Sequence, residues 1–154
     1  MTIHANPREI NQSEVKHMDA RQYLEQVYDM KNHIKRLNQE LDSYRELASS
    51  MPGCNLDERI NKQRSTEAPF VKYIYKIMDL EDEIKTETGR LEIMKLEIGH
   101  QINILEDTNE RLVLRYRYLV CMPWNEIADR LHYSIRYVYK IHGRALQHFE
   151  KRTP

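Results

Sequence analysis

The sequence predicts an all-α protein, in which a long antiparallel helical hairpin of coiled-coil type is followed by a C-terminal tri-helical helix-turn-helix module. Three observations support this fold class. The chain of 154 residues has only four glycines and 31% charged residues, a composition typical of long helices. Apolar residues recur at heptad spacing along two long segments, and strand-type alternation is scarce. A short apolar helix pattern, a turn and a capped helix pattern follow near the end of the chain.

The first helix of the hairpin is predicted from about residue 15 to residue 48. Residues 1–14 are polar and lack a period, so they are expected to form a flexible tail. Two apolar rows then follow a 4-3 spacing, which is typical of a helix that packs on another helix. The rows are Tyr23, Met30, Leu37 and Tyr44, and Val27, Ile34, Leu41 and Ala48. Residues 49–66 interrupt the pattern, and Met51-Pro52-Gly53 indicates a turn, so a loop is expected there.

The second helix of the hairpin is predicted over residues 67–106. Its apolar residues recur every seven positions at Phe70, Ile77, Ile84, Leu91, Ile98 and Leu105. Ser65 or Thr66 is suited to cap its start. Gly89 and Gly99 weaken the helix by roughly 1 kcal/mol each relative to alanine, without ending it. An intramolecular hairpin and a parallel oligomer of each segment are both compatible with this pattern.

The apolar surface of the hairpin is wider than a single partner helix covers. The apolar residues outside the two rows are Leu24, Ile74, Ile102 and Ile104. This width favours a bundle of more than two helices, and hence a homodimer of hairpins. The residues expected to support oligomerisation are Ile34, Leu37, Leu41 and the six residues of the row from Phe70 to Leu105. A hairpin that serves only as a spacer is the alternative.

The C-terminal module is predicted over residues 107–152. Asp107-x-x-Glu110 resembles a capping box and opens its first helix. The core candidates of that helix are Leu112, Val113, Leu114, Tyr118 and Leu119. The second helix runs from Trp124 to about Leu131, and i, i+3, i+4, i+7 spacing places Trp124, Ile127, Ala128 and Leu131 on one face.

The third helix begins after the turn His132-Tyr133-Ser134, where Ser134 is suited to the N-cap position. Its predicted inner face consists of Val138, Ile141, Ala145 and Phe149. Its predicted outer face carries Arg136, Tyr137, Lys140 and Arg144, with Tyr139 on the flank. A short helix, a tight turn and a capped helix with a basic and aromatic outer face are typical of a helix-turn-helix, whose last helix fits the DNA major groove.

The formal charge is distributed unevenly along the chain. From Asp107 to the end, nine Lys/Arg and five Asp/Glu give about +4, and the first 106 residues, with fifteen basic and nineteen acidic groups, carry about −4. The basic end therefore favours an anionic partner such as double-stranded DNA. The cations expected to contact DNA are Arg117, Arg130, Arg136, Lys140 and Arg144. The alternative is a basic helix face that is exposed to solvent and binds no ligand.

The segment RYRYLVCMPWNEIADRLHYSIRYVYKIHGRAL resembles region 4 of bacterial sigma-70 factors. The matching positions are Leu114, Arg115, Arg117, Tyr118, Glu126, Ile127, Ala128, Leu131, Ser134, Val138, Ile141, Ala145 and Leu146. The chain departs from that pattern at Pro123, where a Ser/Thr cap is usual, and at Ile135, where a polar residue is usual. With a coiled-coil front in place of a promoter-melting region, the whole chain resembles phage late-transcription activators of the RinA and ArpU type.

This resemblance implies a module that binds promoter DNA and assists the host RNA polymerase. Carried over by position, the residues that face DNA are Ser134, Arg136, Tyr137, Tyr139 and Lys140, and Arg117 approaches the phosphates. A sequence-specific transcription regulator of a phage or prophage, acting in the cytoplasm of a bacterial host, is therefore the leading hypothesis. A small terminase-like packaging protein, or a coiled-coil protein that binds polymerase without reading DNA, are the alternatives.

Several other classes of protein are not expected. No run of eighteen apolar residues is present, so no membrane span is predicted. Cys54 and Cys121 lack the spacing of metal ligands, so two free thiols are expected. Glu126 and Asp129 are helix-surface carboxylates, and no Gly-rich phosphate loop or Ser-His-Asp set is visible. No enzymatic activity, cofactor or metal is therefore predicted.

Overall fold

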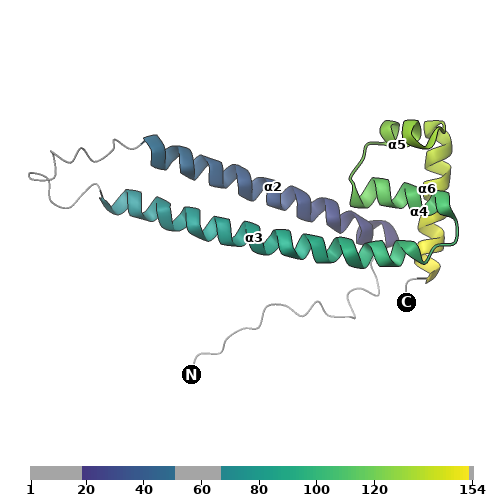
Figure 1. Cartoon of the computed structure of the whole chain (residues 1–154), viewed down its shortest axis with the longest axis horizontal. Helices are drawn as coiled ribbons and strands as arrows, with labels where there is room; N and C mark the ends of the chain where they lie inside the picture. Colours follow the sequence, from purple (N-terminus) through teal and green to yellow (C-terminus); the bar gives the residue numbers. More distant parts are fainter. Residues whose placement is uncertain (1–18, 51–66, 153–154) are drawn as a thin grey trace, which may run out of the picture. The chain divides into compact units, whose positions relative to one another are not determined.

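A computed structural model describes residues 19–50 and 67–152, and within these ranges the protein is all-α (Figure 1). The elements are α2 (Ala20–Ser50), α3 (Glu67–Asn103), α4 (Thr108–Leu114), the π-helical turn η2 (Arg115–Leu119), α5 (Trp124–Leu131) and α6 (Ile135–Arg152). The predicted all-α fold class is confirmed, including the two long helices. The predicted tail 1–14, the Met51-Pro52-Gly53 turn, the Ser65 or Thr66 cap and Cys54 lie outside the described residues.

Contacts divide the chain into two compact units. The hairpin unit comprises the described residues of the range 29–94, and the terminal unit comprises residues 19–28 and 95–152. The sequence pattern predicted a domain boundary at residue 106, whereas the contacts assign the first residues of α2 and the last residues of α3 to the same unit as α4, α5 and α6. No helix in the described ranges is long and apolar enough to cross a membrane.

The hairpin unit consists of antiparallel segments of α2 and α3 (Figure 1). Leu37 and Leu41 of α2 are buried against Leu80 of α3, as the 4-3 spacing predicted. Partly buried Tyr44, Ile77 and Ile84 flank this core. The seam residues of the hairpin unit therefore pack within one chain.

Ion pairs run along both edges of the hairpin unit. Arg45 Nη2 lies 2.7 Å from Glu81 Oε1, and Lys76 Nζ lies 3.5 Å from Glu40 Oε1. The tyrosine rings of Tyr44 and Tyr73 pack with their centroids 6.1 Å apart. Exposed pairs of this kind contribute only about 0–1 kcal/mol each, so the apolar seam supplies most of the stability.

The terminal unit accounts for part of the wide apolar stripe that the sequence showed. Leu24 of α2 and Ile102 of α3 are fully buried there, together with Val27, Ile98 and Leu105. The ring of Tyr23 stacks on that of Phe149, near the end of α6, at 6.3 Å between centroids. Ile74 and Ile104, the other two residues outside the seam, are exposed. Half of the extra apolar surface is thus covered by the chain itself.

The helix predicted to begin at residue 107 is regular only over its first two turns. Asp107 caps α4, because its Oδ1 accepts hydrogen bonds from the backbone N–H groups of Asn109 and Glu110 at 2.7 and 3.2 Å. From Arg115 to Leu119 the chain widens into a π-helical turn, in which the Val120 N–H donates to the Arg115 carbonyl at 3.1 Å. The apolar spacing of this segment gave no indication of a π-helical turn.

Most of the residues that were expected to support oligomerisation are buried or partly buried within the chain itself. Leu91, Ile98 and Leu105 are buried, and Ile34, Ile77 and Ile84 are partly buried. Phe70, near the start of α3, is 41% exposed. Its place in the heptad row alone therefore does not bury it.

Candidate nucleic-acid interface

The C-terminal helices share a compact apolar core in the terminal unit. Its buried residues come from α4, α5, α6 and the segment before α5: Val113, Met122, Ile127, Ala128, Val138 and Ile141. Tyr116, Trp124 and Leu131 pack around it. The predicted inner face of α6 is confirmed, because Val138, Ile141 and Ala145 are fully buried and Phe149 is nearly so.

The turn between α5 and α6 is closed by backbone geometry. His132 adopts the left-handed conformation, with φ 56° and ψ 38°, and its N–H donates to the carbonyls of Ala128 and Asp129. Ser134 then begins α6, because its Oγ accepts a hydrogen bond from the Tyr137 N–H at 3.2 Å. The predicted Ser134 cap is confirmed, and it fixes where the outer face of α6 starts.

Trp124 joins three elements around the start of α5. Its ring lies 4.8 Å from the ring of Tyr139 and 4.9 Å from that of His142, both on α6. The guanidinium of Arg117, in η2, lies 4.7 Å from the centre of the same indole. Pro123 precedes Trp124 at the N-cap position and offers no side-chain cap, so these ring contacts help to position α5.

Tyr118 and His142 form a buried polar pair beside this cluster. Tyr118 Oη and His142 Nε2 are 2.8 Å apart and share a hydrogen bond. Burial, together with the nearby charges of Arg21 and Arg117, lowers the pKa of His142 to about 4. Burial likewise raises the pKa of Tyr118 to about 12. Both side chains are therefore neutral near neutral pH, which suits a structural role in the core.

The outer face of α6 carries Arg136 and Lys140, both exposed, as predicted. Neither cation has an acidic partner among the residues that the structure describes. Tyr139 is 49% exposed beside them, although one side of its ring contacts Trp124. Gly143 follows on the same face, and a Cβ built on it would meet no atom within 4 Å. The N-terminal half of α6 thus presents positive charge, aromatic surface and an open glycine.

The front of this face is more apolar than the sequence analysis recognised. Tyr133 and Ile135 are both exposed, and the ring of Tyr133 contacts that of Tyr137 edge-on at 5.0 Å. Tyr133 and Ile135 were missing from the predicted site, although the position of Ile135 next to the Ser134 cap was a usable signal. Together with Tyr137 and Tyr139, these exposed side chains provide apolar surface of the kind that can contact thymine methyl groups.

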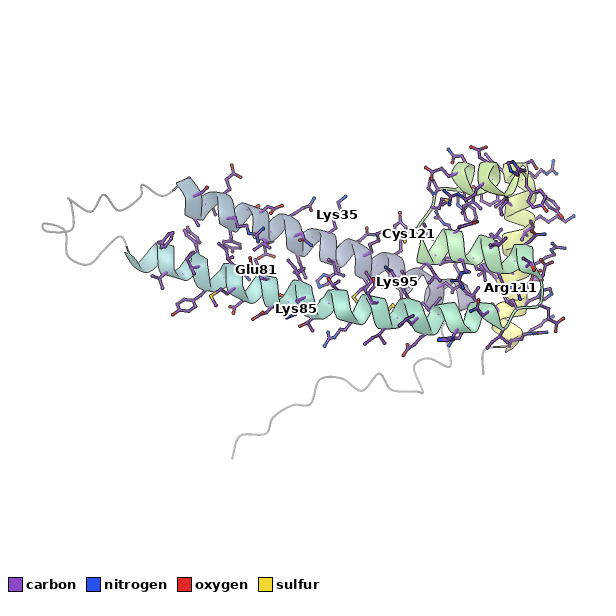
Figure 2. All side chains as sticks on the ribbon, in the orientation of Figure 1. Lys35, Glu81, Lys85, Lys95, Arg111 and Cys121 are labelled. Atoms are coloured by element: carbon purple, nitrogen blue, oxygen red, sulfur yellow. The ribbon has the colours of Figure 1, made fainter. Side chains whose placement is uncertain are left out.

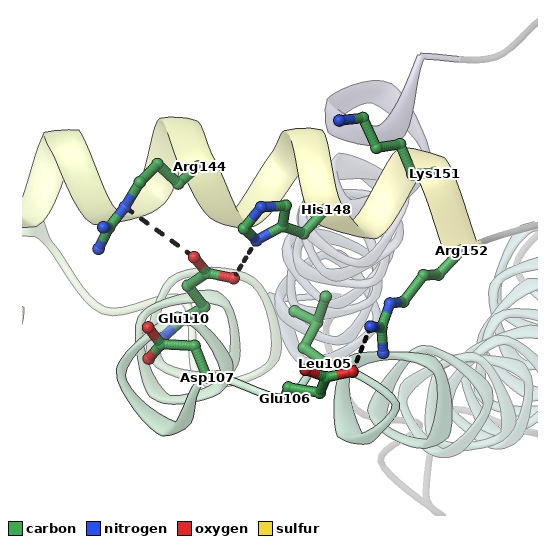
Figure 3. Close-up of a pocket in the computed structure, with 8 residues that line it drawn as sticks. All are labelled: Leu105, Glu106, Asp107, Glu110, Arg144, His148, Lys151 and Arg152. Carbon is green, nitrogen blue, oxygen red and sulfur yellow. Dashed lines mark hydrogen bonds and ion pairs between the residues drawn. The ribbon is translucent and has the colours of Figure 1, made fainter.

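Arg144 lies on α6 but is directed toward α4 (Figure 3). Its Nε lies 3.9 Å from Glu110 Oε1, and His148 Nδ1 lies 2.8 Å from Glu110 Oε2. Glu110 is only 2% exposed. The carboxylate therefore ties α4 to α6, whereas a complete capping box requires it to reach back to the Asp107 N–H. The expectation of a capping box holds for Asp107, and Glu110 has a different role.

A pocket of about 400 Å³ adjoins this group (Figure 3). It is lined by Leu105, Glu106, Asp107, Glu110, Arg144, His148, Lys151 and Arg152. Its charges largely neutralise one another: Arg152 Nη2 lies 2.5 Å from Glu106 Oε1, and Arg152 Nη1 donates to the Ile104 carbonyl at 2.9 Å. These contacts fasten the end of α6 and leave little net charge for a ligand.

The remaining two predicted contacts, Arg117 and Arg130, lie over aromatic rings. Arg117 is partly buried, and its Nη1 donates to the Met122 carbonyl at 3.3 Å. Arg130 is exposed, with its guanidinium 5.6 Å from the centre of the Tyr116 ring. Arg117 thus helps to hold the fold together, whereas the charge of Arg130 is exposed to solvent. No group of three or more potential metal ligands occurs in the described part of the chain.

Comparison with known proteins gives one family. Searches of the curated proteins and of the solved structures found nothing that matches the chain. A family model described as "Protein of unknown function (DUF1492)" matches residues 60–150, which is more than half of the 154-residue chain and includes α3 and all of α4 to α5 with most of α6. The chain therefore belongs to the DUF1492 family.

Proposed function

We propose that this protein is a sequence-specific DNA-binding transcription regulator, and that α6 is its recognition helix. One observation carries the proposal: Arg136 and Lys140 project from a capped, exposed helix without an acidic partner among the described residues. Cations held in this way are available to guanine edges or to phosphates. Tyr137 and Tyr139 add groups that can contact phosphate or the thymine methyl.

The geometry around α6 supports docking in a groove. A helix-turn-helix inserts the N-terminal part of its second helix into the major groove. Here Arg136 and Lys140 lie in that part of α6, and the paired Arg144 and Arg152 lie in the second half. We therefore assign Ser134, Arg136, Tyr137, Tyr139 and Lys140 to the DNA-facing surface, with Arg130 as a phosphate contact.

The broader biological role follows from the sequence resemblance. We propose a late-gene activator of a phage or prophage, which acts with the host RNA polymerase in the bacterial cytoplasm. This part of the proposal depends on the likeness of the C-terminal module to sigma-70 region 4 and on the coiled-coil hairpin that accompanies it.

The test is selection of bound fragments from phage and host genomic DNA, followed by titration of the selected duplex at several salt concentrations. Each phosphate contact contributes a slope of about −0.9 in log K against log salt, so three cations predict a slope near −3. Added polymerase is expected to increase occupancy of the selected sites. A flat salt dependence, or equal affinity for selected and random duplexes, would contradict the proposal.

A matched pair of variants controls for charge. Lys140→Ala removes a cation from α6, and Arg45→Ala removes one from the hairpin unit, where it pairs with Glu81. Only Lys140→Ala is expected to weaken DNA binding. Equal loss in both variants would indicate a general effect of net charge. Binding of polymerase by a chain that ignores DNA would favour the interaction-protein alternative.

A further inference from the structure

One face of α3 in the hairpin unit carries large apolar side chains that the described residues leave exposed. Ile74 is 38%, Met78 is 54% and Ile93 is 59% exposed. They do not belong to the seam with α2, because successive helical residues turn by about 100° and Met78 therefore lies about half a turn from the buried Leu80. Three exposed apolar residues in line on one helix face indicate a surface that binds a partner.

The residues between them complete a regular band. At steps of three or four residues from Ile74 the positions are Ile74, Met78, Asp82, Lys85, Gly89 and Ile93. All six are within the hairpin unit and fall within a band about 100° wide on α3. Figure 2 shows Lys85 on the side of α3 away from α2, whereas Glu81 bonds to Arg45 of α2.

The order of these residues reads symmetrically in both directions. The steps are four, four, three, four and four residues, and the midpoint lies between Asp82 and Lys85. Apolar Ile74 and Ile93 stand at the two ends, and a large Met78 on one side corresponds to the small Gly89 on the other. A helix face with this symmetry is complementary to itself when two copies pair antiparallel about a two-fold axis.

We infer that this face of α3 binds a second copy of the same chain, antiparallel, with the two-fold axis between Asp82 and Lys85. Asp82 of each copy then faces Lys85 of the other. Met78 packs against Gly89 of the second copy, and Ile74 packs against Ile93. Among the described residues neither Asp82 nor Lys85 has an ion-pair partner, so both charges are available for this contact.

Gly89 supports the same register. A Cβ built on Gly89 would meet nothing within 4 Å, so packing within the chain does not require a glycine there. Glycine in the middle of a helix is less favourable than alanine. In the paired helices, Gly89 provides the space that the long Met78 side chain of the second copy fills. This inference does not depend on DNA binding.

The test uses charge reversal on the intact chain and is measured by sedimentation equilibrium without DNA. Asp82→Lys and Lys85→Asp each place like charges opposite one another twice per dimer. Each is expected to raise the dimer dissociation constant about tenfold or more. The double variant, and an equimolar mixture of the two single variants, restore opposite charges at both contacts and are expected to recover the dimer.

Lys35→Asp is the matched control, since Lys35 is an exposed lysine on α2 and lies outside the band (Figure 2). It is expected to leave the dissociation constant unchanged. A wild-type chain that remains monomeric at high concentration would overturn the inference. A dimer whose dissociation constant is unchanged by Asp82→Lys would also overturn it, because such a dimer would use another surface.

Disulfide cross-linking distinguishes the two orientations. In chains that carry Cys54→Ser and Cys121→Ser, a mixture of Met78→Cys and Gly89→Cys variants is expected to cross-link between copies under oxidation. Met78→Cys alone is not, since the two copies of position 78 are far apart in the antiparallel pair. Efficient cross-linking of Met78→Cys alone would show a parallel pair and overturn the inferred register.

Discussion

Several cations of the hairpin unit, though not Lys85, form ion pairs within the described residues, in contrast to the two cations in the N-terminal half of α6. In the hairpin unit Arg45, Lys76 and Arg90 each lie within 2.6 to 3.5 Å of a carboxylate. On α6, Arg136 and Lys140 have no such partner among the described residues. The second half of the same helix returns to pairing, through Arg144 and Arg152. Exposed ion pairs stabilise a fold only slightly, so the main consequence of pairing is that it removes charge from the surface. The DNA contacts that we propose lie in this unpaired stretch.

The largest expected effect is on DNA affinity, when the unpaired cations of α6 are removed. Arg136→Ala and Lys140→Ala should each weaken binding of the selected duplex by roughly 1–3 kcal/mol and relax the preference at one base pair. Arg144→Ala is the control on the same helix and should cost much less, because Glu110 already offsets its charge. Competition titrations with single-base variants of the duplex measure both quantities. Similar losses for Arg144→Ala and Arg136→Ala would remove the distinction between paired and unpaired cations.

Arg117 sharpens the comparison between cations that support the fold and cations that bind DNA. Arg117→Ala removes a guanidinium that lies over Trp124 and donates to the Met122 carbonyl, so it should reduce the free energy of unfolding by about 2 kcal/mol. Arg130→Ala removes an exposed guanidinium over Tyr116 and should reduce it by well under 1 kcal/mol. Urea unfolding followed by tryptophan fluorescence checks the difference. If Arg117→Ala weakens DNA binding at unchanged stability, Arg117 acts as a phosphate contact after all.

His142 offers a pH-dependent test of the terminal unit. Because its folded pKa is about 4, below the ordinary value of about 6.5, its contribution to stability is complete above about pH 6.5 and is lost as the pH falls toward 4. After allowance for partial solvent exposure, the expected loss between about pH 7 and pH 4 is about 1–2 kcal/mol. Unfolding curves at several pH values measure it.

The His142→Gln variant provides the matching control, since a glutamine side chain at position 142 does not titrate. Its stability should depend less on pH over the same interval, even if the substitution lowers stability throughout. A wild-type protein whose stability is as flat as that of the variant would contradict the lowered pKa.

The smallest expected effect is that of the Gly143→Ala variant, which should change the free energy of unfolding and DNA affinity in opposite directions. Gly143→Ala should raise the free energy of unfolding by about 0.5–1 kcal/mol, because alanine favours the helix and its Cβ meets no atom of the protein. The same methyl group lies on the face assigned to DNA, so affinity should fall. Thermal unfolding and duplex titration of one preparation suffice. A variant that gains both stability and affinity would place Gly143 outside the interface.

Much of this structure was accessible from the sequence, because helices that bury one face repeat their apolar residues at fixed spacing. The Leu37, Leu41 and Leu80 seam and the inner face of α6 both follow from that rule. The Ser134 cap was also predictable, since a hydroxyl before an apolar periodic segment has a defined hydrogen-bond partner. These features depend on short-range geometry.

Other features depend on contacts that spacing does not encode. Glu110 had the right position for a capping box, yet His148, 38 positions away in the sequence, provides its partner. Leu24 and Ile102 seemed available to another copy, but the terminal unit buries them. The band from Ile74 to Ile93 was missed for a different reason. The seam residues of α3 recur every seven positions, whereas the residues from Ile74 to Ile93 are spaced by three or four positions and do not form a seven-residue row.

At the π-helical turn Arg115–Leu119, the number of residues affects the fold as well as their identity. A π-type hydrogen bond spans five residues where an α-type bond spans four, so the turn accommodates one residue more than a regular helix does. Deleting a single residue there would let α4 continue as an α-helix, and Tyr118 would change its position around the helix axis relative to His142. An insertion or deletion of one residue in this short stretch would therefore reorient α4 relative to the elements that follow it, without changing any side chain of α6.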